Sequence, residues 1–177
     1  LVRFFCEKAD LQAEVIIGSS KENNKVTALQ DGIYHAWNAV QVEGKWRLLD
    51  ATWGAGYGSD TGYVSAQNRT FFFAPPAKFA QSHLPFDPVW QLLSKPVTLQ
   101  QFIEKERIQI DPGDYNFRDT ILATERLDSL DRQVASMRRM LDFDPSKVRY
   151  HYGIASIYSR KGSSFLSESE TLFKQDV

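Results

Sequence analysis

The sequence predicts an α+β fold, with an antiparallel sheet and helices in residues 1–95 and an all-α extension in residues 96–177. Two observations predict this division. Short runs of β-branched and aromatic residues, separated by Gly- and Pro-containing breaks, occur in the first part and are typical of strands. After Pro96 the apolar residues recur at steps of three and four, which is the period of amphipathic helices.

The composition narrows the functional classes. A formal net charge of −1 with scattered Lys and Arg gives no electrostatic footprint for nucleic acid or for an anionic membrane surface. No apolar run approaches the roughly 20 residues that span a bilayer, so we expect no membrane insertion. The only cysteine, Cys6, excludes an internal disulfide and a cysteine-rich zinc site.

The first residues resemble the later part of a helix. Residues 1–9 predict a helix end with Leu1, Phe4 and Phe5 as its apolar face. Because the chain starts with Leu rather than Met, inside this helix, we expect it to be a piece of a longer protein, and its compartment stays open. Two elements follow: a buried strand at residues 13–18 and a polar loop at residues 19–25.

The next two apolar segments predict a β-hairpin. Residues 34–42 and 45–53 are rich in β-branched and aromatic residues, and the Gly-containing turn Glu43-Gly44 lies between them. The first part then ends with a Gly-rich surface loop at residues 54–63, a strand at 71–76 that meets a proline break, a short helix at 77–81, and a loop through Pro85 and Pro88.

The all-α part is predicted from its period. The apolar stripe of residues 117–141 favours core packing, with docking of a protein partner as the alternative. In order, the predicted elements are a helix at 98–108, a breaker at 111–116, a helix at 117–141, a helix from Asp144 through Tyr158 with Gly162 as its stop, and a last helix at 165–173.

The hairpin brings two polar side chains together. With a two-residue turn, Trp37 lies opposite Asp50, and every second residue along a strand shares a face. His35 and Asp50 then project to the same side as diagonal neighbours, roughly 7–8 Å apart at the backbone. A four-residue turn preserves this arrangement, whereas a three-residue turn breaks it. The sequence therefore predicts contact between an imidazole and a carboxylate.

Such a pair has a direct chemical use. A thiol is a weak nucleophile until an adjacent imidazole takes its proton, and a carboxylate on the other ring nitrogen fixes the tautomer and stabilises the imidazolium. The pair lacks only a cysteine, which is best placed at a helix N-terminus, where the dipole lowers the pKa of a thiol.

The surrounding residues resemble a known family. HAWNAVQVEGKWRLLDATWGAG, residues 35–56, is similar to the central motif of transglutaminase-like proteins, H-x-W-N-x-V…G-x-W-x-x-x-D-x-T-W-G. In that motif His35 matches the catalytic His and Asp50 the catalytic Asp. The matching structural positions are Trp37, Asn38, Trp46, Thr52 and Trp53.

The flanking segments extend the resemblance over about residues 1–103. The first 21 residues resemble the helix that follows the catalytic cysteine of the family and the strand after it. Residues 71–93 resemble the downstream segment of bacterial members and of the kyphoscoliosis-peptidase-like group. The resemblance to bacterial members favours a bacterial protein that is periplasmic or secreted.

The resemblance implies a papain-type core and a cysteine acyl-transfer protein that carries out transamidation, deamidation or peptide hydrolysis on a protein or peptide substrate. It assigns His35 as general base and then general acid, and Asp50 as the carboxylate that orients it. Trp37, Asn38 and Trp53 are candidates for the substrate cleft, although tryptophans in this motif also serve as core. The chemistry needs no cofactor and no metal.

The nucleophile of the family falls a handful of residues before Leu1. Cys6 instead aligns with a second cysteine late in the same helix, where a thiol beside Glu7 gains no help from the helix dipole. We therefore interpret Cys6 as a small buried hydrophobe, and we expect the chain to be inactive alone. A non-catalytic scaffold or interaction module is the alternative function.

Two further histidines have ordinary interpretations. His83, in SHLP, is interpreted as a structural or surface histidine, with a second acid–base group as the alternative. His151 lies in the all-α part and carries no predicted role.

Overall fold

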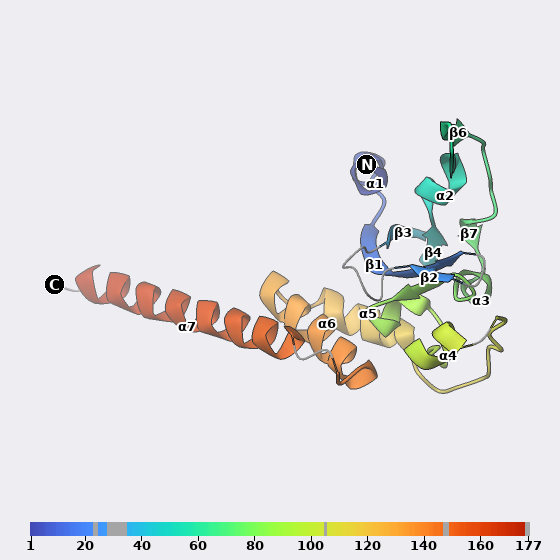
Figure 1. The fold of residues 1–177 in the computed structure, drawn as a ribbon. Helices are drawn as coiled ribbons and strands as arrows, with labels where there is room; N and C mark the ends of the chain where they lie inside the picture. The colour runs from blue at the N-terminus through green and yellow to red at the C-terminus, as the bar shows by residue number, and fades with distance from the viewer. Residues whose placement is uncertain (23–24, 28–34, 105, 147–148, 176–177) are drawn as a thin grey trace. The chain divides into compact units, whose positions relative to one another are not determined.

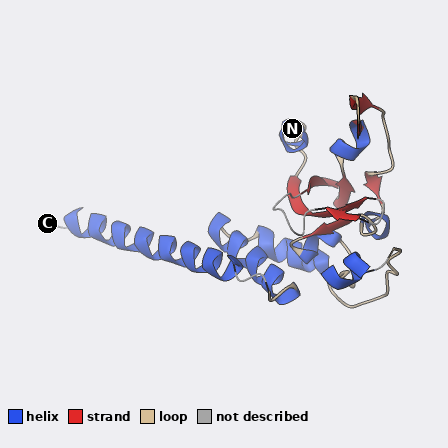
Figure 2. Cartoon of the chain, viewed as in Figure 1, coloured by secondary structure: helices blue, strands red, loops and turns tan. Residues whose placement is uncertain are grey.

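An antiparallel sheet forms the centre of the first part of the protein in the computed structural model, which describes residues 1–22, 25–27, 35–104, 106–146 and 149–175 (Figure 1). The chain divides into two units, Leu1–Arg118 and Asp119–Val177. Within the described residues the strands lie in the first unit and the second unit is helical (Figure 2). The predicted α+β class is confirmed.

The sheet has the strand order β2-β1-β3-β4-β7, and β8 pairs with β1 outside this order. All of these pairs are antiparallel. The strands are β1 (Ala13–Glu22), β2 (Lys25–Thr27), β3 (His35–Val42), β4 (Lys45–Leu49), β7 (Phe72–Ala74) and β8 (His83–Pro85), and a separate hairpin consists of β5 (Gly56–Ser59) and β6 (Gly62–Ser65).

Short helices accompany these strands. The helix α1 (Val2–Lys8) precedes β1, α2 (Ala51–Ala55) and α3 (Pro76–Phe79) lie between strands, and the 3-10 helix η1 (Pro88–Gln91) and α4 (Leu99–Glu104) follow β8. Three longer helices follow, α5 (Phe117–Glu125), α6 (Ser129–Phe143) and α7 (Arg149–Gln175). In the described part of the chain, none of the helices combines the length and the apolar character that a membrane crossing requires.

The predicted hairpin and its register are confirmed. Ala39 of β3 pairs with Leu48 of β4, as a two-residue turn requires. The turn residues Glu43 and Gly44 have φ values of 51° and 69°. Positive φ at both central positions is the mark of a type I′ turn, whose twist matches that of paired strands.

Two predicted boundaries near the hairpin are wrong. The second strand ends at Leu49 rather than at residue 53, because the Asp50 side chain accepts hydrogen bonds from the following backbone N–H groups and begins α2. The predicted Gly-rich loop at 54–63 instead contains β5 and the start of β6. The glycines of β5 and β6 make this segment look like a loop, because they interrupt the alternation of apolar and polar residues that indicates a strand.

The polar loop predicted at residues 19–25 is wrong for residues 19–22 and 25, which belong to β1 and β2, and residues 23–24 lie outside the described residues. β1 continues through Glu22, and Ser19, Ser20 and Lys21 are buried because β8 and β2 pair with this end of the strand. The Lys21 ammonium donates a hydrogen bond to the backbone carbonyl of Phe102 at 3.1 Å. Tertiary pairing thus overrides the polar composition of the segment.

The helix α1 is confirmed, but its predicted apolar face is wrong. Leu1, Phe4 and Phe5 are 92%, 54% and 60% exposed. Val2 and Cys6, four residues apart on the other side of the helix, pack instead against a buried cluster. That cluster consists of Ala13, Val40 and Leu49.

The first unit extends past residue 95, where the sequence predicts the boundary between domains. One of its buried clusters includes Phe102, which is 0% exposed, and Ile108, which is 3% exposed. They pack with Ala80, Leu84, Leu93 and Val97. The contacts of α4 therefore complete the sheet unit, which runs to Arg118.

The second unit departs from two predictions. The helix predicted over 117–141 is interrupted between α5 and α6. The Asp128 side chain accepts hydrogen bonds from the backbone N–H groups of Leu130 and Asp131 and so caps the start of α6. The helix α7 continues through Gly162, which was predicted to stop it. The Lys161 side chain forms ion pairs with Asp128 and Asp131 and links α7 to α6 next to that glycine.

Candidate functional site

The carboxylate of Asp50 lies where β4 ends and α2 begins, and its side chain is 0% exposed. Its Oδ1 atom accepts hydrogen bonds from the backbone N–H groups of Thr52, at 2.8 Å, and Trp53, at 3.0 Å. These bonds are those of a helix N-cap, and they fix the plane of the carboxylate. The second oxygen, Oδ2, is turned toward the sheet.

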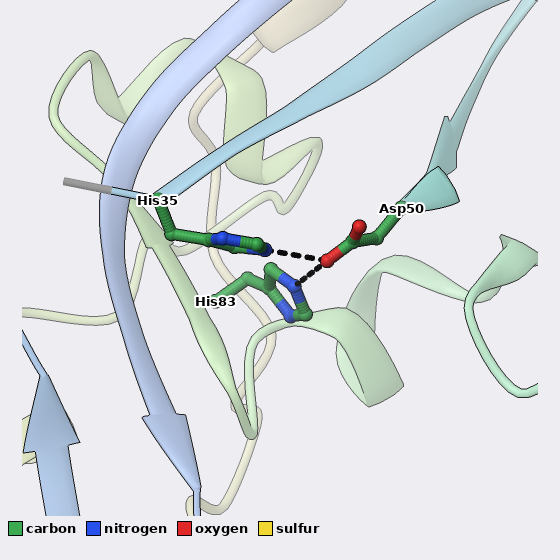
Figure 3. A group of neighbouring side chains, drawn as sticks. All are labelled: His35, Asp50 and His83. Carbon is green, nitrogen blue, oxygen red and sulfur yellow. Dashed lines mark hydrogen bonds and ion pairs between the residues drawn. The ribbon is translucent and has the colours of Figure 1, made fainter. Parts of the chain in front are cut away.

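Two imidazoles meet at that second oxygen (Figure 3). His35, at the start of β3, places Nε2 2.5 Å from Oδ2 of Asp50. His83, at the start of β8, places its own Nε2 3.0 Å from the same oxygen. The residues come from three separate segments of the first unit, and the pairing of β1 with both β3 and β8 brings the two histidines to one place.

The predicted contact between His35 and Asp50 is therefore present. The His35 side chain is 17% exposed, so one part of its ring reaches solvent while the other contacts Asp50. The ring stacks with Trp37 at a centroid distance of 6.0 Å and lies 5.4 Å from the ring of Trp53. These rings restrict the orientation of the imidazole.

His83 is more enclosed. Its side chain is 0% exposed, and its Nδ1 lies 2.8 Å from the hydroxyl of Ser82. Four aromatic rings surround the imidazole at centroid distances of 4.5–5.0 Å, namely Trp37, Trp53, Phe71 and Phe79. Of the two interpretations of His83, as a structural or as a surface histidine, the surface one is wrong, because β8 carries the side chain into the buried site.

The electrostatics favour an ionised Asp50 carboxylate beside a neutral His83 imidazole. Burial by itself raises the pKa of Asp50, but hydrogen bonds from His35, His83 and the Trp53 N–H outweigh burial and hold that pKa below its usual range. Burial lowers the pKa of His83, and its hydrogen bond to Asp50 opposes this only in part. His83 is therefore uncharged at neutral pH.

The hydrogen-bond partners assign the ring protons. An ionised carboxylate only accepts hydrogen bonds, so Nε2 of each histidine carries the proton that points at Asp50. The Nδ1 atom of His83 is then an acceptor, and the Ser82 hydroxyl donates to it. In neutral His35 the Nδ1 atom is likewise left with its lone pair.

The three cleft candidates have different surroundings. Trp37 is 2% exposed, and its indole Nε1 has no hydrogen-bond partner among the described residues. The Asn38 amide donates to the backbone carbonyl of Glu14 at 3.2 Å and ties β3 to β1. Trp53 is half-buried beside His35. Their part in a substrate cleft stays a prediction.

The same three side chains are the group of described residues whose donor atoms suit a metal. The two imidazole nitrogens and a carboxylate oxygen lie within 4.8 Å of one another. Their N···O distances of 2.5 and 3.0 Å are those of charge-assisted hydrogen bonds. Ligands around zinc, each about 2.0–2.2 Å from the ion, must stand farther apart than these two N···O pairs.

The single thiol lies away from this site. Cys6 packs against the cluster that contains Val40, and Val40 points to the opposite face of β3 from His35, since the two are an odd number of residues apart. Along β1 the partners of Val40 and His35 are Ala13 and Gly18, a separation of roughly 17 Å. Cys6 is therefore a packing residue, although it is partly rather than fully buried as predicted.

The comparison with known proteins points in the same direction as the motif. No protein-family model matches the chain. The chain is 38% identical to a kyphoscoliosis peptidase of Mus musculus over 101 residues, 31% identical to hillarin of Drosophila melanogaster over 117 residues, and 29% identical to the Lim and transglutaminase domain protein ltd-1 of Caenorhabditis elegans over 120 residues.

These similarities suggest a transglutaminase-like family. They cover 55–58% of this chain but only 14–16% of the relatives, so the chain spans about one seventh of the proteins it matches. All three relatives are animal proteins. The predicted bacterial origin is not tested by them and stays a prediction.

Proposed function

We propose that this chain is part of a transglutaminase-like acyl-transfer protein in which His35 is the general base and acid and Asp50 is the carboxylate that orients it. The observation that carries the proposal is the bond from Nε2 of His35 to the buried Asp50 carboxylate. It leaves Nδ1 of a partly exposed ring as the atom that exchanges protons.

The proposed reaction follows the chemistry of a cysteine, a histidine and a carboxylate. Nδ1 of His35 takes the proton of a thiol, and the thiolate sulfur attacks a glutamine carboxamide or a peptide carbonyl. The imidazolium that forms is stabilised by Asp50. It then returns its proton to the leaving amine, and the resulting thioester is resolved by an amine or by water.

In this proposal the nucleophile is a cysteine outside these 177 residues. Cys6 is the only cysteine in the sequence, and its packing on the other face of the sheet supports a structural role. The relatives are named for peptidase and transglutaminase chemistry, and we propose a protein or peptide substrate on that basis.

The test uses the full-length protein that carries the proposed thiol. Incorporation of a fluorescent amine into a glutamine-containing protein and cleavage of unfolded protein substrates are measured in parallel. His35→Ala should abolish turnover, whereas His151→Ala, a change at an exposed histidine on α7, should leave it unchanged. Turnover that survives His35→Ala eliminates the proposal.

A non-catalytic scaffold is the second candidate, and the lack of a suitably placed thiol in this chain favours it. The residue that the full-length protein places at the first turn of the α1 helix discriminates between the two. A cysteine at the first turn of that helix supports the enzyme, because the helix dipole there lowers the pKa of a thiol. Any other residue at that position supports the scaffold.

A further inference from the structure

His83 has no part in the reaction proposed above, yet it is the most enclosed titratable residue in contact with Asp50. Its side chain is 0% exposed. It reaches Oδ2 of Asp50 from β8, while His35 reaches the same oxygen from β3. A buried polar side chain with two well-defined partners calls for an explanation beyond packing.

The hydrogen bonds of Asp50 supply that explanation. A carboxylate has about four acceptor positions. Asp50 receives bonds at all of them: two backbone N–H groups at Oδ1, from Thr52 and Trp53, and two imidazole N–H groups at Oδ2. The bond from His83 therefore fills the fourth acceptor position of the Asp50 carboxylate, so the carboxylate needs no further donor in a site walled by aromatic rings.

The neutral state of His83 matters for the same reason. A cationic group in this position would neutralise Asp50, and Asp50 would then stabilise an imidazolium on His35 less well. A neutral donor satisfies the oxygen without supplying a charge. The Ser82 hydroxyl, which donates to Nδ1 of His83, holds the tautomer that presents Nε2–H to Asp50.

We propose that His83 is a second, positioning histidine, which completes the hydrogen bonding of Asp50 and so keeps that carboxylate aligned for His35. The inference rests on the proposed function for its catalytic meaning. The arrangement Ser82–His83–Asp50–His35 is a chain in which every donor points toward Asp50.

The first test is made on the 177-residue chain itself and needs no turnover. Nitrogen-15 NMR of the imidazoles at neutral pH should show His83 uncharged with its proton on Nε2. A cationic His83, or a proton on Nδ1, overturns the proposal. Because this measurement uses the unaltered protein, it holds even if a variant fails to fold.

The second test uses two substitutions and follows the carboxyl carbon of Asp50 by NMR as the pH is lowered. The titratable groups that act on Asp50 are His35 and His83. His83→Phe removes the donor, so the titration midpoint of Asp50 should rise by about one to two pH units. His83→Gln, whose amide N–H can replace Nε2–H, should restore most of the original value. An unchanged midpoint in folded His83→Phe overturns the proposal.

His151→Phe is the matched control, since His151 is exposed on α7. It should leave the Asp50 titration unchanged. Zinc is then added to the unaltered chain to test the alternative use of the same three side chains. Stoichiometric binding that shifts the ring nitrogens of both His35 and His83 overturns the proposal, because zinc would replace the hydrogen bonds to Asp50.

In the full-length protein, failure of the proposed function and failure of the proposed role of His83 give different results. Turnover that is insensitive to His35→Ala removes the proposed function. Turnover that needs His35 but is unaltered in His83→Phe, in rate and in pH profile, removes only the role of His83. The expected result is a fall in kcat of about 10–100-fold in His83→Phe with little change in KM, and partial rescue in His83→Gln.

Discussion

Replacement of Asp50 by Asn removes the charge at the centre of the site while it keeps the size of the side chain. The amide oxygen still accepts the two backbone hydrogen bonds that cap α2. The amide nitrogen, however, is a donor, and it takes the place of the oxygen that accepts from Nε2 of His35 and of His83. The amide N–H group of the Asn side chain then faces the Nε2–H groups of His35 and His83, and no hydrogen bond can form between them.

The size of the effect follows from these bonds. Each hydrogen bond to a charged group contributes about 1.5–3 kcal/mol, so the loss of two would cost about 3–6 kcal/mol if nothing adjusted. Both imidazoles can move their proton to Nδ1, and the Ser82 hydroxyl can reverse to accept from His83. We therefore expect Asp50→Asn to lower the free energy of unfolding by about 2–4 kcal/mol.

Urea unfolding followed by tryptophan fluorescence measures this loss in the right part of the molecule, because all four tryptophans lie in the first unit. Asp60→Asn, at an exposed position of the turn between β5 and β6, is the matched control and should change little. NMR should also show both imidazoles of the Asn variant with the proton on Nδ1. Unfolding of Asp50→Asn within about 0.5 kcal/mol of the unaltered chain refutes the reasoning.

Two further predictions concern packing and pH. A Cβ atom at Gly18 would lie 2.1 Å from the carbonyl oxygen of Leu84 and 2.6 Å from the ring of Trp37, so Gly18→Ala should lower the free energy of unfolding by about 1–3 kcal/mol and shift the Trp37 fluorescence. Burial lowers the pKa of His83 in the folded chain. Below about pH 6.5 the unfolded chain therefore binds a proton that the folded chain does not, and the free energy of unfolding decreases as the pH is lowered. Between about pH 7 and about pH 5 this fall should be smaller in His83→Gln, and an equal fall in both proteins contradicts the assignment.

The half of the site that the sequence predicts depends on local rules. Once Glu43-Gly44 is a two-residue turn, the period of the strands places His35 and Asp50 on one side without any knowledge of the rest of the fold. The turn and the pairing are set by residues adjacent in sequence. For this reason the sequence alone predicts the contact between the His35 imidazole and the Asp50 carboxylate.

The other half depends on distant pairing. His83 lies 33 residues after Asp50, on the three-residue strand β8. A strand that short shows no period, and its pairing with β1 follows from the close approach that Gly18 permits. The apolar face of α1 was missed for a related reason, since both sides of that helix carry apolar residues and only the position of the sheet decides which is buried.

Asp50 joins the fold to the site, and this limits what its presence can reveal about function. The same side chain ends β4, caps α2 and satisfies the buried His83. A scaffold without a nucleophile would need all three of these contacts in order to fold. His35 differs, because it is 17% exposed and contributes nothing to the cap. Of the three residues, His35 is therefore the one whose substitution separates an enzyme from a scaffold: its loss should abolish acyl transfer while it leaves the sheet and α2 intact.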